Sequence, residues 1–231
     1  MVATKLSAQR AGQPDFLIVA VALVLTPFLI DGFVRRELYA ISPSLYWAFD
    51  FLKFVVLPAA AAICLARAFG VRPKHYGIRG IAQNETWVQF IGLTVFVMLL
   101  LAGVHYATYY VAWFVLRPEV AQPFYQEINP AGILRVPTTL YMAVTAAVVE
   151  EVFCRGIPLL YLQRRFPNGI PKAIYVWSTA LLFGFLHWEN GFHDVVAAFV
   201  FGLAAAAIYL KLRDLWPLMG GHFVIGLVAL W

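Results

Sequence analysis

Long apolar stretches separated by short polar segments run along the whole chain. A helix needs about 20 mostly apolar residues to cross the hydrocarbon core of a bilayer. Stretches of that kind recur at seven places, near 15–33, 44–69, 87–116, 137–163, 173–189, 194–210 and 215–231. No polar segment between them is long enough to fold alone. The pattern predicts an all-α polytopic transmembrane helix bundle and a single membrane domain over residues 1–231, with re-entrant segments as the alternative for two of the seven spans.

The composition supports a membrane protein and argues against a soluble domain. Hydrophobic residues make up 62% of the chain and charged residues only 13%, whereas soluble domains average about 45–50% apolar and about 25% charged residues. The formal net charge of +5 could indicate nucleic acid as a partner. In membrane proteins, however, an excess of Lys and Arg is typical of cytoplasmic loops. We therefore expect the lipid bilayer as a partner and exclude nucleic acid.

The basic residues are distributed unevenly between the two sides of the predicted bundle. If the N-terminus lies inside, eleven fall on the cytoplasmic side: Lys5, Arg10, Arg67, Arg72, Lys74, Arg79, Arg164, Arg165, Lys172, Lys211 and Arg213. The opposite side receives four: Arg35, Arg36, Arg117 and Arg135. This asymmetry favours an N-terminus in the cytoplasm and an uncleaved first helix. A compact chain without large loops is typical of a bacterial protein, so we expect the cytoplasmic (inner) membrane.

The fourth predicted helix carries three charged residues in the middle of an apolar stretch. Glu150, Glu151 and Arg155 are hard to explain by packing alone, because an ionisable side chain at the centre of a membrane helix costs about 2.5–3.5 kcal/mol on insertion scales. Glu151 and Arg155 are four residues apart and share a helix face, so Arg155 can neutralise Glu151. Glu150 points about 100° away around the helix. A carboxylate shielded from bulk water there suits a general base or acid.

Two histidines in later apolar segments are the candidate partners of Glu150. His187 follows Phe183 in the fifth segment, and His222 follows two glycines in the seventh. A carboxylate and two imidazoles in a site of low dielectric could activate a water molecule and stabilise an oxyanion. The same set, Glu150, His187 and His222, could instead hold a zinc ion. The activated-water reading requires no cofactor.

Each of these residues also has a purely structural interpretation. A lone histidine within a membrane is often an interhelical hydrogen-bonding residue, and the Glu150–Glu151–Arg155 cluster could be a structural ion pair. We interpret His105 as structural and Asp50 with Lys53 as a local pair. The turn residues Glu189, His193 and Asp194 are interpreted as solvated, with orientation of His187 as the alternative, and the loop 122–135 as a connector.

The combination of motifs resembles the CAAX-processing and bacteriocin-processing family of intramembrane proteases, which includes the Ras-converting CAAX endopeptidase and sorting-tag-associated bacterial relatives. That family has Glu-Glu-x-x-x-Arg on one helix, Phe-x-x-x-His on a later one, and His-x-x-x-Asn or Asp on a third. Glu150, Glu151 and Arg155 match the first motif, and Phe183 with His187 match the second. The third matches in part, because His222 is present but position 226 is Gly. The resemblance covers about residues 137–231, the expected catalytic core in the last four helices, whereas 1–136 match only as additional transmembrane helices.

The resemblance implies an endopeptidase that cleaves a membrane-proximal or C-terminal segment of a protein or peptide substrate. It implies that Glu150 and His187 activate the attacking water, that Glu151 and Arg155 support the site together with Phe183, and that His222 helps to bind the oxyanion. Gly226 lacks the side chain that would share this last task, and it leaves open a catalytically impaired relative acting as a scaffold or immunity protein. A small proton-coupled transporter is the other alternative, although no inverted repeat supports it. The oligomeric state is unknown from the sequence.

Overall fold

The computed structural model describes residues 15–79, 86–116, 124 and 128–231, and within these residues it contains helices and turns but no strand. Seven helical segments follow the apolar stretches, which confirms the all-α bundle. They are α2 (Asp15–Ile41), the run of α3 (Pro43–Phe51), η1 (Leu52–Val56) and α4 (Leu57–Phe69), α5 (Trp87–Leu116), the run of α7 (Arg135–Glu151), η5 (Val152–Gly156) and α8 (Ile157–Arg165), α9 (Lys172–Phe185), α10 (Phe192–Leu212) and α11 (Trp216–Leu230).

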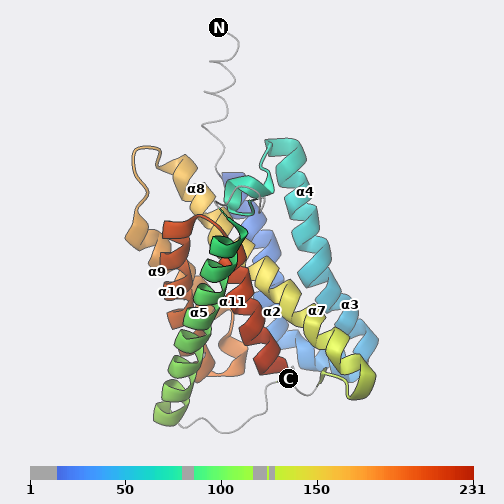
Figure 1. Cartoon of the computed structure of the whole chain (residues 1–231). Coiled ribbons are helices and arrows are strands. Elements are labelled where there is room, and N and C mark those ends of the chain that lie inside the picture. The colour runs from blue at the N-terminus through green and yellow to red at the C-terminus, as the bar shows by residue number, and fades with distance from the viewer. Residues whose placement is uncertain (1–14, 80–85, 117–123, 125–127) are drawn as a thin grey trace.

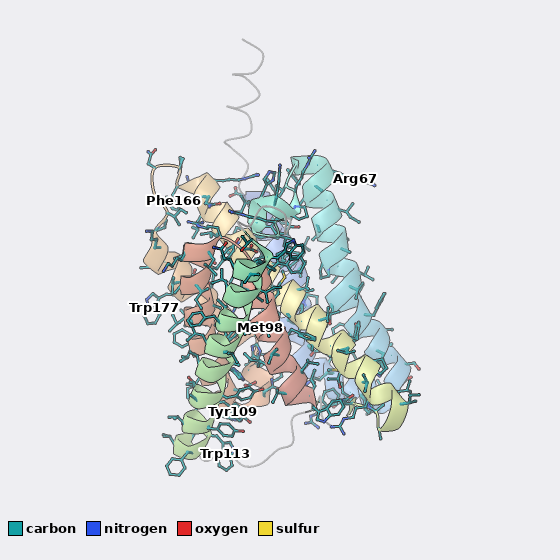
Figure 2. All side chains as sticks on the ribbon, in the orientation of Figure 1. Arg67, Met98, Tyr109, Trp113, Phe166 and Trp177 are labelled. Carbon is teal, nitrogen blue, oxygen red and sulfur yellow. The ribbon has the colours of Figure 1, made fainter. Side chains whose placement is uncertain are left out.

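Five of these segments are long and apolar enough to cross a bilayer, while α9 and α11 are shorter apolar helices. The lateral surface of the bundle carries large apolar side chains. Trp177 is 55% exposed and Val88 is 80% exposed, and Figure 2 shows Trp177 pointing outward from α9. Because such side chains are favourable against lipid rather than water, the chain is an integral multi-pass membrane protein.

Two helix ends differ from the sequence prediction. We expected the first helix to end near 33 and Arg35 to lie in a loop, but α2 continues to Ile41 and Arg35 is buried. We expected His187 within the fifth helix, but α9 ends at Phe185 and His187 lies in the turn that leads to η6 (Trp188–Asn190). Arg35 can stay inside the bundle because it is paired there with Glu189, at 3.2 Å.

Some of the residues that bear on the predicted membrane orientation lie outside the part of the chain that the structure describes. Lys5, Arg10, Arg117 and residues 122, 123 and 125–127 of the loop 122–135 lie outside the described residues. In Figure 2, Arg67 and Phe166 lie at one end of the bundle, and Trp113 lies at the opposite end. Arg164 also lies at the first end, with its guanidinium 5.8 Å from the ring of Phe16 at the start of α2.

Glycines let α11 approach two neighbouring helices closely. An added Cβ at Gly221 would lie 3.1 Å from Leu101 of α5, and one at Gly226 would lie 3.3 Å from both Cα and Cβ of Ala143 of α7. Small residues at such contacts allow helix backbones to approach in a membrane. The fold therefore holds α11 between α5 and α7, an arrangement that can be followed in Figure 1.

Two runs of helix contain a π-helical turn, and each turn ends two residues before a proline. η1 precedes Leu57 and Pro58, and η5 precedes Ile157 and Pro158. A proline has no N–H to donate and its ring clashes with the carbonyl four residues earlier. The backbone adapts by i→i+5 bonding, so that the N–H of Ile157 donates to the carbonyl of Val152. Such π-turns are frequent at functional sites, and these two carry the buried cations Lys53 and Arg155.

Candidate active site

The centre of the site is an ion pair within one helical run. Glu151 is the last residue of α7 and Arg155 lies in η5. The Arg155 Nη1 donates to Glu151 Oε1 at 2.9 Å, and both residues are 0% exposed. The predicted pairing of these two residues is therefore present in the fold. Because both charges are fully removed from solvent, each depends on the other for compensation.

Phe183 of α9 compensates Arg155 from the other side. The guanidinium carbon lies 3.8 Å from the centre of the Phe183 ring, a close cation–π contact. The Nε and Nη2 atoms of Arg155 have no hydrogen-bond partner among the described residues. The aromatic face therefore stabilises a charge whose donors are only partly satisfied. The Phe183 ring also contacts the rings of His187 and His222, with ring centres 4.7 and 5.7 Å away, respectively.

His222 connects the two glutamates. Its Nδ1 lies 2.9 Å from Glu151 Oε1, within hydrogen-bond distance. Its Nε2 lies 3.8 Å from Glu150 Oε2, which is close but not a hydrogen bond. Since a carboxylate can only accept a hydrogen bond, Nδ1 carries the proton that Glu151 accepts. Glu151 thus orients the His222 ring so that Nε2 faces Glu150.

His187 is oriented by the backbone of its own chain segment. Its Nδ1 lies 2.9 Å from the carbonyl oxygen of Phe183. A carbonyl only accepts, so Nδ1 carries the proton, and Nε2 of the neutral ring is left as an acceptor. The turn after α9 makes this bond, and it leaves the ring partly exposed to the cavity described next.

A cavity of about 450 Å³ joins these side chains inside the bundle. Glu150, His187 and His222 all line it, and so do Ile225 and Gly226 of α11. Glu150 is 7% exposed, and its Oε2 has no hydrogen-bond partner among the described residues. The fold therefore places all three predicted catalytic side chains on one cavity, whereas Glu151, Arg155 and Phe183 lie behind it.

The cavity also contains residues that the sequence analysis set aside. His105 of α5, which we interpreted as structural, lines it. Glu189, expected in a solvated turn, is only partly exposed and pairs with Arg35. The predicted pair of Asp50 and Lys53 exists at 3.5 Å but belongs to a larger group in the same cavity. The available signal was the presence of these ionisable residues within apolar spans, which usually marks function.

Gly226 has a packing role that an asparagine could not fill without movement. A side chain there would meet the Ala143 backbone, which cannot rotate away. The close contact of α11 with α7 holds His222, one helical turn earlier, against the two glutamates. The departure from the family pattern at 226 thus accompanies a tight helix contact beside the site.

We expect Gly226→Ala to destabilise the protein relative to Gly103→Ala. A helical Gly→Ala change gains about 1 kcal/mol from helix propensity at either position, but overpacking costs about 1–3 kcal/mol. Gly103 of α5 is a matched control, because an added Cβ there meets nothing within 4 Å. Thermal unfolding in detergent should place Gly226→Ala below Gly103→Ala. Equal stabilities would show that the α7–α11 contact is looser than described.

Glu150, His187 and His222 were also predicted as possible ligands of a zinc ion. Each histidine offers a free Nε2 and bonds through Nδ1 to an oxygen, the usual support for a metal-bound imidazole. Within the described residues, however, no group of three or more His, Cys, Asp or Glu is placed to hold a metal ion. As positioned, Glu150, His187 and His222 do not form a ready ligand set, so the steps given below use only side chains of the chain.

Comparison with known families identifies the part of the chain that forms this site. Residues 132–228 match the family described as type II CAAX prenyl endopeptidase Rce1-like. Comparisons with curated proteins and with solved structures gave no match. The matched region contains Glu150, Glu151, Arg155, Phe183, His187 and His222. Over residues 132–228, which carry all six of these predicted site residues, the chain is therefore similar to the CAAX-type family of intramembrane proteases.

Proposed function

We propose that this protein is an intramembrane endopeptidase in which Glu150 activates a water molecule for attack on a peptide bond. The observation that carries the proposal is the cavity on which Glu150, His187 and His222 meet, all three within the region that matches the protease family. The Glu150 carboxylate lies 3.8 Å from His222 Nε2 and shares the cavity with His187, and its Oε2 has no hydrogen-bond partner among the described residues. It is therefore free to accept a proton from water.

The reaction proceeds in two steps. Glu150 takes a proton from a water molecule that His187 Nε2 orients, and the water oxygen attacks the carbonyl carbon of the scissile bond. The carbonyl oxygen becomes an oxyanion, and His222 donates to it from Nε2 in the doubly protonated form of the ring. Glu150 then passes its proton to the leaving nitrogen as the C–N bond breaks. Glu151 and Arg155 hold His222 in place throughout.

The substrate is a protein or peptide segment that reaches the cavity within the bilayer. A membrane-proximal or C-terminal segment fits this position, because the cavity lies among the helices and not on an extramembrane domain. We place the protein in the cytoplasmic membrane of a bacterium with the N-terminus inside, as the distribution of basic residues favours. Maturation or sorting of a membrane-anchored protein is the role that agrees with this location.

The test is cleavage of membrane-anchored fluorogenic peptides by the purified protein in detergent. We expect His187→Ala to lower turnover by about 10²-fold, at the lower end of the range of about 10²–10⁴ for general acid–base groups. His75→Ala is the matched control, because His75 is exposed in η2 (Pro73–Tyr76). Absence of cleavage by the wild type across the whole panel would contradict the proposal.

Removal of metal ions separates the two forms of the mechanism. We expect activity to persist after dialysis against a strong chelator, because the steps above use only side chains. Loss of activity that is restored by zinc would replace the glutamate-activated water with a metal-bound one. Peptide cleavage would remain the function in either case.

A further inference from the structure

A second charged group faces the catalytic residues across the same cavity, and it comes from helices outside the family-matched region. Asp31 of α2 lies with its Oδ2 3.1 Å from the Lys53 ammonium of η1. Asp50 of α3 lies with its Oδ1 3.5 Å from the same ammonium and accepts a hydrogen bond from Tyr141 at 3.0 Å. All three charged residues are buried and line the cavity. Such a group within membrane helices is expensive and usually functional.

We call the side of the cavity formed by Asp31, Asp50, Lys53, Arg35 and Glu189 the acidic wall. Its two cations are already paired with carboxylates. Lys53 lies between two carboxylates, and its ammonium lies 4.6 Å from the centre of the Phe54 ring. Arg35 donates to Glu189 and Asn190, at 3.2 and 3.5 Å. The charge of each cation is therefore already compensated by at least one carboxylate, so an anionic ligand would meet little uncompensated positive charge. A carboxylate group of a substrate would therefore bind poorly at the acidic wall.

The carboxylates, in contrast, keep unused acceptor atoms. Asp31 is 6% exposed, and its Oδ1 has no hydrogen-bond partner among the described residues. The Oε2 of Glu189 is likewise without a partner there. Among the described residues that line the cavity, five are carboxylic acids, Asp31, Asp50, Glu150, Glu189 and Asp194, against Arg35, Lys53 and the three histidines His105, His187 and His222. The unpaired carboxylate oxygens can thus accept hydrogen bonds from a positively charged donor.

The acidic wall is joined directly to the turn that carries His187. An added Cβ at Gly32 would lie 2.9 Å from the Cβ of Glu189, so α2 packs directly on this turn. Glu189 is two residues after His187 in sequence. A group bound at Asp31 would therefore lie beside the catalytic turn, within the reach of one extended peptide segment.

We propose that Asp31, with Glu189, binds a basic side chain of the substrate, a lysine or an arginine close to the scissile bond. This inference rests on the proposed protease function and adds its specificity. A long basic side chain can place its charge between the unpaired oxygens while its methylene groups contact the apolar lining. Desolvated charge pairs of this kind discriminate strongly, because a neutral substitute leaves the acceptors without a donor.

The test compares membrane-anchored peptides that differ at one position near the cleaved bond. Lysine, arginine, norleucine and glutamate are placed in turn at each flanking position, and kcat/KM is measured for the full-length protein in lipid nanodiscs. We expect the wild type to prefer a basic residue over norleucine by at least about tenfold at one position. Asp31→Asn should reduce that preference to about threefold or less, whereas Asp31→Glu should retain most of it. Glu37→Gln is the matched control, because Glu37 is exposed on the same helix, and it should keep the full preference.

A binding measurement separates this inference from the proposed function. The same peptides with an N-methylated scissile amide resist cleavage, and their Kd is read by fluorescence anisotropy. Tighter binding of the basic peptides that is lost in Asp31→Asn, without cleavage of any normal peptide, would support the basic subsite and overturn the protease. Cleavage and binding without a charge preference, or a preference unchanged in Asp31→Asn, would overturn the basic subsite alone.

Discussion

Replacement of Glu150 by Gln is expected to abolish most of the peptidase activity, lowering turnover by roughly 10²–10⁴-fold. Glutamine has almost the same shape but cannot accept the proton of the attacking water or return it to the leaving nitrogen. The fold should survive the change, because Glu150 Oε2 has no hydrogen-bond partner among the described residues and the His222 Nε2 atom is 3.8 Å away. The measurement is kcat on a cleavable anchored peptide, with thermal unfolding of the same sample.

Two variants sharpen this expectation. Glu37→Gln removes an exposed carboxylate from α2 and should leave turnover within experimental error. Glu151→Gln should lower both activity and stability, because Glu151 is bonded to Arg155 and to His222. Activity of Glu150→Gln above about one tenth of the wild-type value would show that another group activates the water, since a general base contributes more than this.

The second large effect concerns stability. Arg155→Met is expected to destabilise the fold by about 3–5 kcal/mol, because it leaves the Glu151 carboxylate buried without its cation. Glu151 is 0% exposed, so water cannot replace the lost partner. The stacking of the guanidinium on Phe183 is lost as well. The free energy of unfolding can be measured by SDS titration in mixed micelles.

A double variant distinguishes a lost charge pair from lost packing. Glu151→Gln combined with Arg155→Met removes both charges, and it should recover a large part of the stability that Arg155→Met loses. Arg165→Met is the matched control, because Arg165 is exposed at the end of the same helical run, and it should change stability by less than about 1 kcal/mol. A loss that is equal in the single and double variants would assign the effect to packing against Phe183 alone.

The sequence predicted much of the bundle because helix formation in lipid depends on local hydrophobicity. The segment predicted at 87–116 coincides with α5, and the other six predictions agree with observed helices apart from their ends. The ends of α2 and α9 were less predictable. In a hydropathy pattern, a charged residue such as Arg35 indicates the end of a helix. In the fold, Arg35 is stabilised inside the bundle by its contact with Glu189, which is distant in sequence.

The pairing of Glu151 with Arg155 was also readable from the sequence, because residues four apart share a helix face. The contact of His222 with both glutamates was not readable, because it depends on how closely α11 packs on α7. The sequence likewise showed Asp50 and Lys53 as neighbours on one helix. It could not show that Asp31 of another helix completes the group, or that this group and His105 line the cavity of Glu150.

The sequence by itself determined that this is a polytopic membrane protein with ionisable residues inside its apolar spans, and with two complete motifs and one partial motif of a protease family. Periodicity and hydrophobicity are local properties, so they are present in the residues themselves. Only the tertiary structure decided which ionisable residues share a cavity, which cations are already paired and which carboxylate oxygens remain free. Those properties depend on contacts between helices far apart in the chain, and glycines such as Gly32 and Gly226 set these contacts through backbone distance.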